Sequence, residues 1–274
     1  MGNSVMIHLI HVDIWLYIPM YLLLSQLSFM DLMYISTTVP NMVVNFLSVQ
    51  KSISLLGHGV QSFFFLTMAC SKGLLLASMA YDQLVVICQP LHYPIHMTKR
   101  MCAKMIAASC TLGSINSLAH TVYALHLPYC RSRAINQSFC NVPAMLPLAC
   151  VDTWVYEYMV FVSTSLFFLL PFLGVPVSYG QILFAIFHMY SKEGRKKAFI
   201  TCSMHLTAVT FYYAPFVYTY LRPRILHSPA EGKILAIFYT ILTPMLNPFI
   251  YSLRNKEVLG ALERVFGIFS SKKK

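Results

Sequence analysis

The sequence predicts an all-α membrane protein, a seven-transmembrane helix bundle with an incomplete first helix. Of its 274 residues, 57% are hydrophobic and only 11% are charged, whereas soluble domains carry about 25% charged residues. A helix needs about 20 apolar residues to cross the roughly 30 Å of hydrocarbon in a bilayer. Six stretches meet this requirement, at residues 20–47, 55–82, 101–125, 154–188, 198–221 and 233–253.

Residues 1–18 precede these stretches and predict a partial first helix. Their apolar core is interrupted by His8, His11 and Asp13 and is too short for an untilted span. We interpret them as part of the first helix of an amino-terminally truncated chain. A cleaved signal peptide is the alternative, but a basic leading region and a small-residue cleavage site are both missing.

The last part of the chain belongs to the same domain, which extends over residues 1–274. Residues 255–269 follow the sixth complete stretch and carry apolar side chains at helical spacing. Such a segment predicts a short helix that lies in the membrane interface.

Lysine and arginine are unevenly distributed between the connectors, which predicts the orientation of the chain. Cytoplasmic connectors are enriched in these residues. One set of alternate connectors holds 13 of the 20 lysines and arginines, the opposite set holds six, and one lies inside a span. The richer side is expected to be cytoplasmic and includes the carboxyl terminus. Its members are Lys99, Arg100, Lys104, Lys192, Arg195, Lys196, Lys197, Arg254, Lys256, Arg264, Lys272, Lys273 and Lys274.

The net charge of +11 does not indicate a nucleic-acid partner. The basic residues are scattered among short connectors and form no stripe with interleaved aromatic residues, so no nucleic acid is expected. The sequence also lacks the G-x-S-x-G, H-E-x-x-H and Walker motifs of common enzymes. Neither catalysis nor a metal or other cofactor is expected, because the histidines lack a matched set of acids or thiols. Examples are His92 and His96 in a connector, and His120 and His126 near a predicted outer helix end.

The long connector 126–153 falls on the predicted outer side and suits the oxidising secretory route. It holds Cys130, Cys140 and Cys150, three of the eight cysteines of the chain. It also holds the single N-x-S/T sequon, at Asn136, which predicts glycosylation. Both features agree with an outer location of this connector.

Four long stretches carry a resemblance to a known family. They are PMYLLLSQLSFMDLMYIST at 19–37, MAYDQLVVICQPLHYP at 79–94, KAFITCSMHLTAVTFYY at 197–213 and PMLNPFIYSLRNKEV at 244–258. In this order, over essentially the whole chain, they resemble the signatures of vertebrate olfactory receptors within the rhodopsin-like G-protein-coupled receptors. The resemblance implies a multi-pass protein of the plasma membrane that binds a small volatile odorant. It also implies signalling through a heterotrimeric G protein of the stimulatory olfactory type to cyclic AMP.

The resemblance also identifies the residues of a signalling switch. In the family, an aspartate at the cytoplasmic end of the third helix precedes an arginine, and here these positions are Asp82 and Gln83. Glutamine has no charge and lacks the five donors of a guanidinium, so it cannot form the same ion pair. The other matched positions are Asp31, Tyr179, His205, Asn247, Pro248 and Tyr251, and Lys72 stands where the family has a carboxylate.

Lys72 is a charged residue deep in a predicted span and needs a partner. Without one, it costs about 2.5–3.5 kcal/mol on insertion scales. Asp31 lies 12 residues after Pro19 on the second helix, and Lys72 lies 11 residues before Gln83 on the antiparallel third. At 1.5 Å per residue, both are roughly 16–18 Å from the cytoplasmic face. The matching depths predict an ion pair, with snorkelling of Lys72 towards the interface as the alternative.

A further departure from the family concerns the cysteines. The family places a cysteine near the outer end of the third helix, where this chain has His58, 25 residues before Gln83. Histidine cannot form a disulfide bond, so its expected partner Cys140 is left without one. The resemblance still allows Cys130 to pair with Cys150.

The resemblance places the odorant in the outer half of the bundle. The positions that would line this site are mostly apolar with a few hydroxyl groups, which suits small neutral volatile molecules. Ordinary packing between helices is the alternative role for each of them. The positions are Phe65, Leu66, Ala69, Cys70, Ser163, Phe167, Tyr213, Val217, Tyr220 and Thr240.

Two other interpretations of the sequence remain open. A transporter or channel would explain the charges of Asp31 and Lys72 inside the membrane, but the two halves of the chain show no internal repeat. A decayed receptor remnant that no longer signals would explain the departures at His58, Lys72 and Gln83. On the receptor interpretation, recovery of signalling is expected to need His58→Cys, Lys72→Glu and Gln83→Arg together, with the missing amino-terminal segment supplied.

Overall fold

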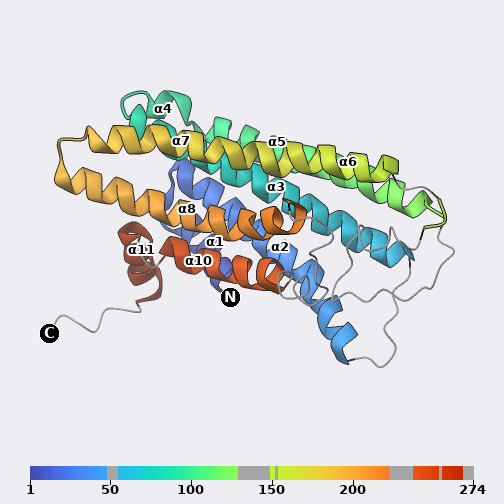
Figure 1. The fold of residues 1–274 in the computed structure, drawn as a ribbon. Coiled ribbons are helices and arrows are strands. Elements are labelled where there is room, and N and C mark those ends of the chain that lie inside the picture. Colours follow the sequence, from blue (N-terminus) through green and yellow to red (C-terminus); the bar gives the residue numbers. More distant parts are fainter. Residues whose placement is uncertain (48–54, 129–148, 152–153, 222–236, 253–254, 268–274) are drawn as a thin grey trace.

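Long helices lying side by side build the described part of the chain (Figure 1). The computed structural model describes residues 1–47, 55–128, 149–151, 154–221, 237–252 and 255–267. The predicted all-α class is confirmed in these ranges. The elements are α1 (Gly2–Val12), the 3₁₀ turn η1 (Ile14–Leu16), α2 (Pro19–Leu47), α3 (Leu55–Cys88), α4 (Tyr93–His96), α5 (Lys99–His126), α6 (Trp154–Thr164), the π-helical turn η4 (Ser165–Leu169), α7 (Leu170–Phe187), α8 (Lys192–Leu221), the π-helical turn η6 (Phe238–Leu242), α10 (Thr243–Ser252) and α11 (Lys256–Phe266).

Two helices, α3 and α8, are each six residues longer than the sequence predicts. Helix α3 was expected to end at residue 82 and continues to Cys88, because its apolar run continues as far as the turn that contains Pro90. Proline disfavours helical geometry in the residue before it, so the helix ends there. Helix α8 starts six residues before the predicted position 198. Its charged first turn is stabilised by Ser191, whose Oγ accepts a hydrogen bond of 3.1 Å from the Gly194 amide.

Three described helical segments are long and apolar enough to cross a membrane, by length and composition. They are Pro19–Pro40, Leu56–Cys88 and the continuous α6–η4–α7 segment Trp154–Phe187. Helix α5 is long enough but less apolar, because it carries polar residues on its inner side. Ser109 and Ser117 are examples, and both are buried within the bundle.

Helix α3 lies at the centre of the bundle and packs against α2, α5, α7 and α8. Its inward side chains include Cys70, Leu75 and Leu76, all at most 1% exposed. Lipid tails are as apolar as leucine, so association of such helices depends on close packing and on polar contacts between them.

The closest packing occurs where α5 meets α3 at Gly113. A Cβ atom at this position would lie 2.3 Å from Ser71 Oγ and 3.0 Å from the Thr67 carbonyl oxygen. The absence of a side chain at residue 113 therefore allows the two helices to approach.

We expect Gly113→Val to lower the free energy of unfolding by about 1–3 kcal/mol, because overpacking forces the helices apart. Thermal unfolding of the purified protein in detergent measures the loss. Gly174→Val on α7 is the matched control, since a Cβ there has no neighbour within 4 Å. Equal effects of the two substitutions would show that the contact between α3 and α5 is not tight.

The amino-terminal segment completes one side of the bundle. Helix α1 packs against α2 and α10, and Asn3 Nδ2 donates a hydrogen bond of 3.0 Å to the Pro244 carbonyl. A Cβ on Gly2 would lie 3.2 Å from the Pro248 ring, so the two helices touch here. Residues 1–18 thus form the short helix α1 followed by the turn η1, in line with the predicted partial first helix.

Helix α11 lies across one end of the bundle (Figure 1). It buries Val258 and Ala261 completely. Arg264 at its far end donates two hydrogen bonds, of 2.9 and 2.7 Å, to Asp13 Oδ2. The carboxylate of Asp13 is 4% exposed, so this ion pair fixes α11 to the connection between α1 and α2.

A second polar cluster joins α11 to the long helices. The Tyr21 hydroxyl donates to Glu257 Oε2 at 2.8 Å, and Lys197 Nζ donates to Glu257 Oε1 at 3.1 Å. Burial alone would raise the pKa of Glu257, but the hydrogen bonds from Tyr21 and Lys197 outweigh it and lower that pKa. Glu257 therefore stays ionised and links α2, α8 and α11.

Candidate functional site

A buried ion pair occupies the middle of the bundle. Lys72 Nζ on α3 lies 2.5 Å from Asp31 Oδ1 on α2, and the two side chains are 4% and 0% exposed. The pairing predicted from their matching depths is present. Snorkelling is not, because Lys72 points inwards to the aspartate.

A third helix contributes to the same centre. Asn247 Nδ2 on α10 donates a hydrogen bond of 2.6 Å to Asp31 Oδ2. Both oxygens of the carboxylate are thus engaged, one by a cation and one by an amide. We call Asp31, Lys72 and Asn247 the charged centre. It connects α2, α3 and α10 at mid-depth.

Two tyrosines of a fourth helix, α8, lie beside the charged centre. Lys72 Nζ lies 5.3 Å from the centre of the Tyr212 ring, within the range of a cation–π contact. The Tyr212 hydroxyl donates to the Ala69 carbonyl at 2.5 Å, and the Tyr213 hydroxyl donates to the Gly73 carbonyl at 3.0 Å. Helix α8 is therefore held to α3 by hydrogen bonds immediately beside the lysine.

The carboxyl-terminal end of α3 carries Asp82 and Gln83, the motif in which glutamine replaces the family arginine. Asp82 is fully buried, and its Oδ1 accepts a hydrogen bond of 3.0 Å from the Tyr93 hydroxyl. Gln83 is 5% exposed and its Nε2 lies 3.5 Å from Met20 Sδ, a weak acceptor. Tyr93 thus provides a neutral donor to the carboxylate.

Tyr93 is suited to this role because its hydroxyl remains protonated. Burial is the main cause that raises the pKa of Tyr93, and the neighbouring Asp82 carboxylate raises it further. A phenol with a raised pKa keeps its proton and continues to donate.

We expect Tyr93→Phe to destabilise the protein by about 1–3 kcal/mol, because it leaves a buried carboxylate oxygen without its donor. Tyr190→Phe is the matched control, since Tyr190 is fully exposed. Thermal unfolding in detergent checks the difference. Equal melting temperatures for the two variants would mean that the Asp82–Tyr93 bond contributes nothing.

A hydrogen bond also connects helices α7 and α8. The Tyr179 hydroxyl on α7 and His205 Nδ1 on α8 are 2.7 Å apart, and their rings stack. Pro248 and Tyr251 are buried in α10, where Pro248 contacts the start of α1. Every residue predicted for the switch is therefore buried inside the bundle, although not in one cluster.

The predicted odorant positions on α3 lie in the amino-terminal half of this helix. Phe65 and Leu66 are partly buried, and the Phe65 ring stacks on Tyr34 with 5.0 Å between ring centres. Ala69 is buried, and its carbonyl accepts the hydrogen bond from Tyr212.

Two further predicted positions form polar contacts with α5. Cys70 is buried and free, and its Sγ accepts a hydrogen bond of 3.4 Å from Asn116 Nδ2. Ser163 Oγ lies 2.9 Å from His120 Nε2. These contacts link α3 and α6 to α5 through side chains.

The remaining odorant positions come from η4, α8 and η6. Phe167 is partly buried against the core, while Tyr213 and Thr240 are buried. The backbone of Val217 and Tyr220 lies in α8, and the side chains of these two residues lie outside the part that the structure describes.

The cysteine and glycosylation predictions fall mostly outside the described residues. Cys150 is disulfide-bonded. Cys130, Cys140 and Asn136 lie in the range 129–148, so the Cys130–Cys150 pairing stays a prediction. His58, at the position of the family cysteine, is 3% exposed and lies 3.4 Å from Ser62 Oγ through its Nδ1.

Sequence reasoning missed several contacts of this polar core. Tyr93 lies within the second motif, yet the sequence did not predict its bond to Asp82. A buried carboxylate without its arginine partner requires another donor, and this requirement was the signal that could have led to Tyr93. Tyr212, Asn116 and His120 were not predicted as core contacts either, because their partners are distant in sequence.

A bundle of long apolar helices with an ion pair buried at its centre defines an integral membrane protein of the helical type. Comparison with known proteins gives the family. The olfactory receptor family model matches residues 1–268. Olfactory receptor 2L13 of Homo sapiens is 77% identical over 269 residues, which cover 98% of this chain and 86% of the relative. Olfactory receptor 2L8 of Homo sapiens is 66% identical over 264 residues, covering 96% and 85%, and olfactory receptor 2V1 of Mus musculus is 50% identical over 263 residues, covering 96% and 84%.

The chain belongs to the olfactory receptor family. Members of this family are G-protein-coupled receptors for odorants, with seven transmembrane helices, and reside in the plasma membrane as multi-pass proteins. The family is not an enzyme family. The comparisons lend no support to a transporter or to a decayed remnant.

Proposed function

We propose that this receptor binds small, neutral, volatile odorants in the outer half of the bundle and signals through a stimulatory G protein to cyclic AMP. In this proposal the carboxyl terminus is cytoplasmic, and the G protein docks at the end of the bundle that carries Asp82 and Gln83. The observation that carries the proposal is the separation of these two regions along one helix. Phe65 and Asp82 are 17 residues apart on α3, which corresponds to roughly 25 Å.

The chemistry of the outer half supports a neutral ligand. Phe65, Leu66 and Phe167 are apolar and partly buried where they pack against the core. Ser163 offers a hydroxyl beside the His120 ring. Such a set favours a small molecule that needs shape complementarity and one hydrogen bond.

The charged centre supports a connection between the two regions. Asp31, Lys72 and Asn247 hold α2, α3 and α10 together at mid-depth, one turn below the odorant position Ala69 on α3. Any displacement of α3 or α10 on odorant binding has to be accommodated by these contacts, because both oxygens of Asp31 are engaged. The centre is therefore placed to transmit a change in helix packing.

Gln83 limits the strength of coupling in this proposal. A guanidinium at this position would offer a charged contact surface that the amide of glutamine lacks. A charge-assisted hydrogen bond contributes about 1.5–3 kcal/mol, equivalent to roughly 10- to 100-fold in affinity. We therefore propose that the receptor couples weakly as it stands and strongly when the arginine is restored in a stable fold.

A cyclic-AMP reporter assay tests the proposal in the variant that combines His58→Cys and Gln83→Arg, screened with a mixture of neutral odorants. In that background, Phe167→Ala is expected to raise the half-maximal odorant concentration by about tenfold or more, because the odorant would bury the rest of the Phe167 ring and full burial of such a side chain contributes about 1.5–3 kcal/mol. Phe184→Ala is the matched control, since Phe184 is 68% exposed on α7.

Surface staining of each variant separates folding from function. If the variant with His58→Cys and Gln83→Arg reaches the surface but responds to no odorant, the proposed function is contradicted. A response that Phe167→Ala and Phe184→Ala reduce equally contradicts the proposed odorant site.

A further inference from the structure

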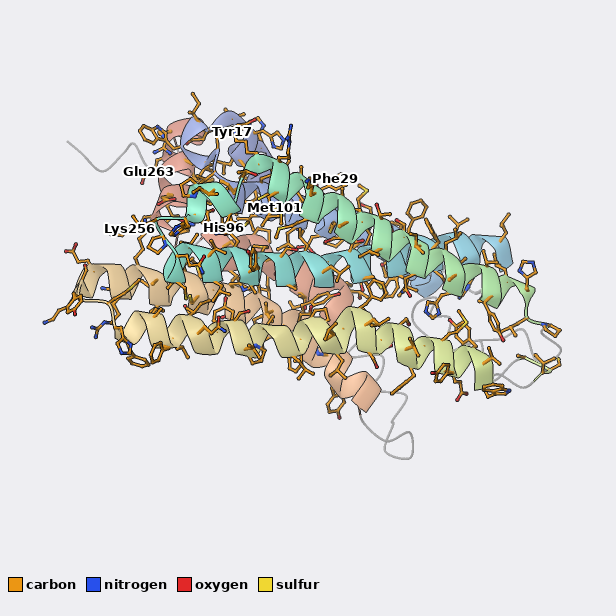
Figure 2. All side chains as sticks on the ribbon, turned by 90° about the horizontal axis from the view of Figure 1, so that it is seen from above. Tyr17, Phe29, His96, Met101, Lys256 and Glu263 are labelled. Atoms are coloured by element: carbon orange, nitrogen blue, oxygen red, sulfur yellow. The ribbon has the colours of Figure 1, made fainter. Side chains whose placement is uncertain are left out.

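An exposed apolar turn lies at the end of the bundle where α11 crosses. Ile14 and Trp15 of η1 are 87% and 77% exposed, and the adjacent Tyr17 is 63% exposed. Figure 2 shows Tyr17 at this end, on the same side as Lys256 and Glu263 of α11. Tryptophan and tyrosine are enriched where hydrocarbon meets the lipid headgroups, because their rings are partly apolar and partly polar. The turn is therefore suited to the membrane interface.

Cations of α5 stand next to this turn. Lys99 Nζ lies 3.5 Å from the centre of the Tyr17 ring, so the first turn of α5 touches η1. Arg100 and Lys104 are also exposed and lie four residues apart, on one face of α5. We call these three cations, together with the exposed Trp15 and Tyr17, the basic aromatic patch.

The acidic residues near the patch leave its charge positive. Asp13 directly precedes η1, but its carboxylate is 4% exposed and holds two hydrogen bonds from Arg264. Glu257 and Glu263 of α11 are further acids on this side, but Glu257 is already bound by Tyr21 and Lys197, and Lys256 of the same helix is also exposed. An anion approaching Lys99, Arg100 and Lys104 therefore meets a surplus of positive charge.

The surface beyond the cations is apolar and has room for a hydrocarbon chain. Ala103, Ala107 and Ala108 follow on the exposed side of α5 and have small side chains. Helix α2 packs against α5 and exposes 45% of Phe29. Figure 2 labels Phe29 beside α5 and Met101 near the start of this helix.

We propose that the basic aromatic patch is a binding site for an anionic phospholipid. The headgroup lies between Lys99, Arg100 and Lys104, and Trp15 and Tyr17 hold the glycerol region. One acyl chain runs along the alanine side of α5 towards Phe29. The site is independent of odorant binding and coupling, so it stands or falls separately from the proposed function.

Fluorescence quenching in liposomes tests the site, because the chain has only two tryptophans, Trp15 and Trp154. The Trp154→Phe variant leaves Trp15 as the reporter within the patch. Its fluorescence is compared in phosphatidylcholine liposomes that contain equal fractions of either brominated phosphatidylserine or brominated phosphatidylcholine. Each lysine or arginine near a surface multiplies association with anionic lipid by about fivefold. We expect Trp15 to report a local enrichment of phosphatidylserine of at least about fivefold, which falls at high salt.

Charge and position provide the controls. The combination Lys99→Gln, Arg100→Gln and Lys104→Gln should abolish the preference for the brominated anionic lipid. The combination Lys192→Gln and Lys196→Gln, which removes exposed cations from α8, should retain it. In the Trp15→Phe variant, Trp154 at the far end of the bundle should show no preference.

Three results would overturn the site. They are equal quenching of Trp15 by both brominated lipids, a preference that survives the triple substitution, and the same preference at Trp154. If the triple variant fails to fold, two other measurements replace it: Arg100→Gln alone, and high salt applied to the unmodified patch. If neither weakens the preference of Trp15 for the brominated anionic lipid, that preference is not electrostatic and the site is overturned.

Discussion

Lys72→Met is expected to lower the free energy of unfolding by about 3–5 kcal/mol, the usual cost of removing one partner from a buried ion pair. Methionine preserves most of the volume of lysine, so the loss comes from charge and hydrogen bonding. The substitution leaves the carboxylate of Asp31, which is 0% exposed, with Asn247 as its remaining hydrogen-bond partner. Thermal unfolding in detergent and surface staining in cells measure the effect.

The control for this prediction is Lys192→Met in the exposed first turn of α8. It removes the same charge from a solvated position and should leave the melting temperature unchanged. If Lys72→Met were as stable as Lys192→Met, the buried pair would be irrelevant to the fold.

Gln83→Arg alone is expected to leave odorant-driven cyclic AMP near the level of the unmodified chain. The arginine restores the charged contact beside Asp82. However, the family has a disulfide-forming cysteine at the position of His58, and histidine cannot form this bond. Such a bond contributes about 2–4 kcal/mol. We expect the double variant with His58→Cys to raise the response at least about tenfold, since 1.4 kcal/mol corresponds to a factor of ten.

His58→Ser with Gln83→Arg is the matched control, because it removes the histidine without providing a thiol. Its response should stay low, and Cys140→Ser should cancel the gain of the double variant. A robust response from Gln83→Arg alone would show instead that the fold was sound and that the missing arginine was the principal loss.

The structure changes one expectation drawn from the sequence. Lys72→Glu was expected to be needed for recovery of signalling, because a buried lysine without a partner destabilises the fold. Asp31 already neutralises Lys72 at 2.5 Å. A glutamate at residue 72 would face the Asp31 carboxylate across the same gap, and two like charges at close range oppose each other. Lys72 is therefore better left in place when signalling is restored.

The helices themselves could be predicted from the sequence because their apolar runs are long. The depth of Asp31 and Lys72 could also be counted, since α2 and α3 are antiparallel and rise by a fixed distance per residue. Helix ends were harder to place. The apolar residues after Asp82 and the charged residues before residue 198 both continue a helix, and hydropathy alone does not distinguish them from connectors.

Contacts between side chains of distant helices were the least predictable part. The partner of Asp82 depends on the turn after α3, which brings Tyr93 back against the helix. The link between Ser163 and His120 depends on how α5 faces α6 and is not encoded in either segment alone. Matching depths select candidates for such pairs, but rotation about the helix axis decides which of them meet.

A double-mutant cycle on the charged centre is the most direct measurement of its role in holding α2 and α3 together. Free energies of unfolding are compared for the unmodified chain, Lys72→Met, Asp31→Asn and the combination of both. We predict that the combination is more stable than the sum of the single losses implies, with a coupling energy of about 2–3 kcal/mol, because neither charge is then left alone. Strictly additive losses would contradict the ion pair at the centre of the bundle.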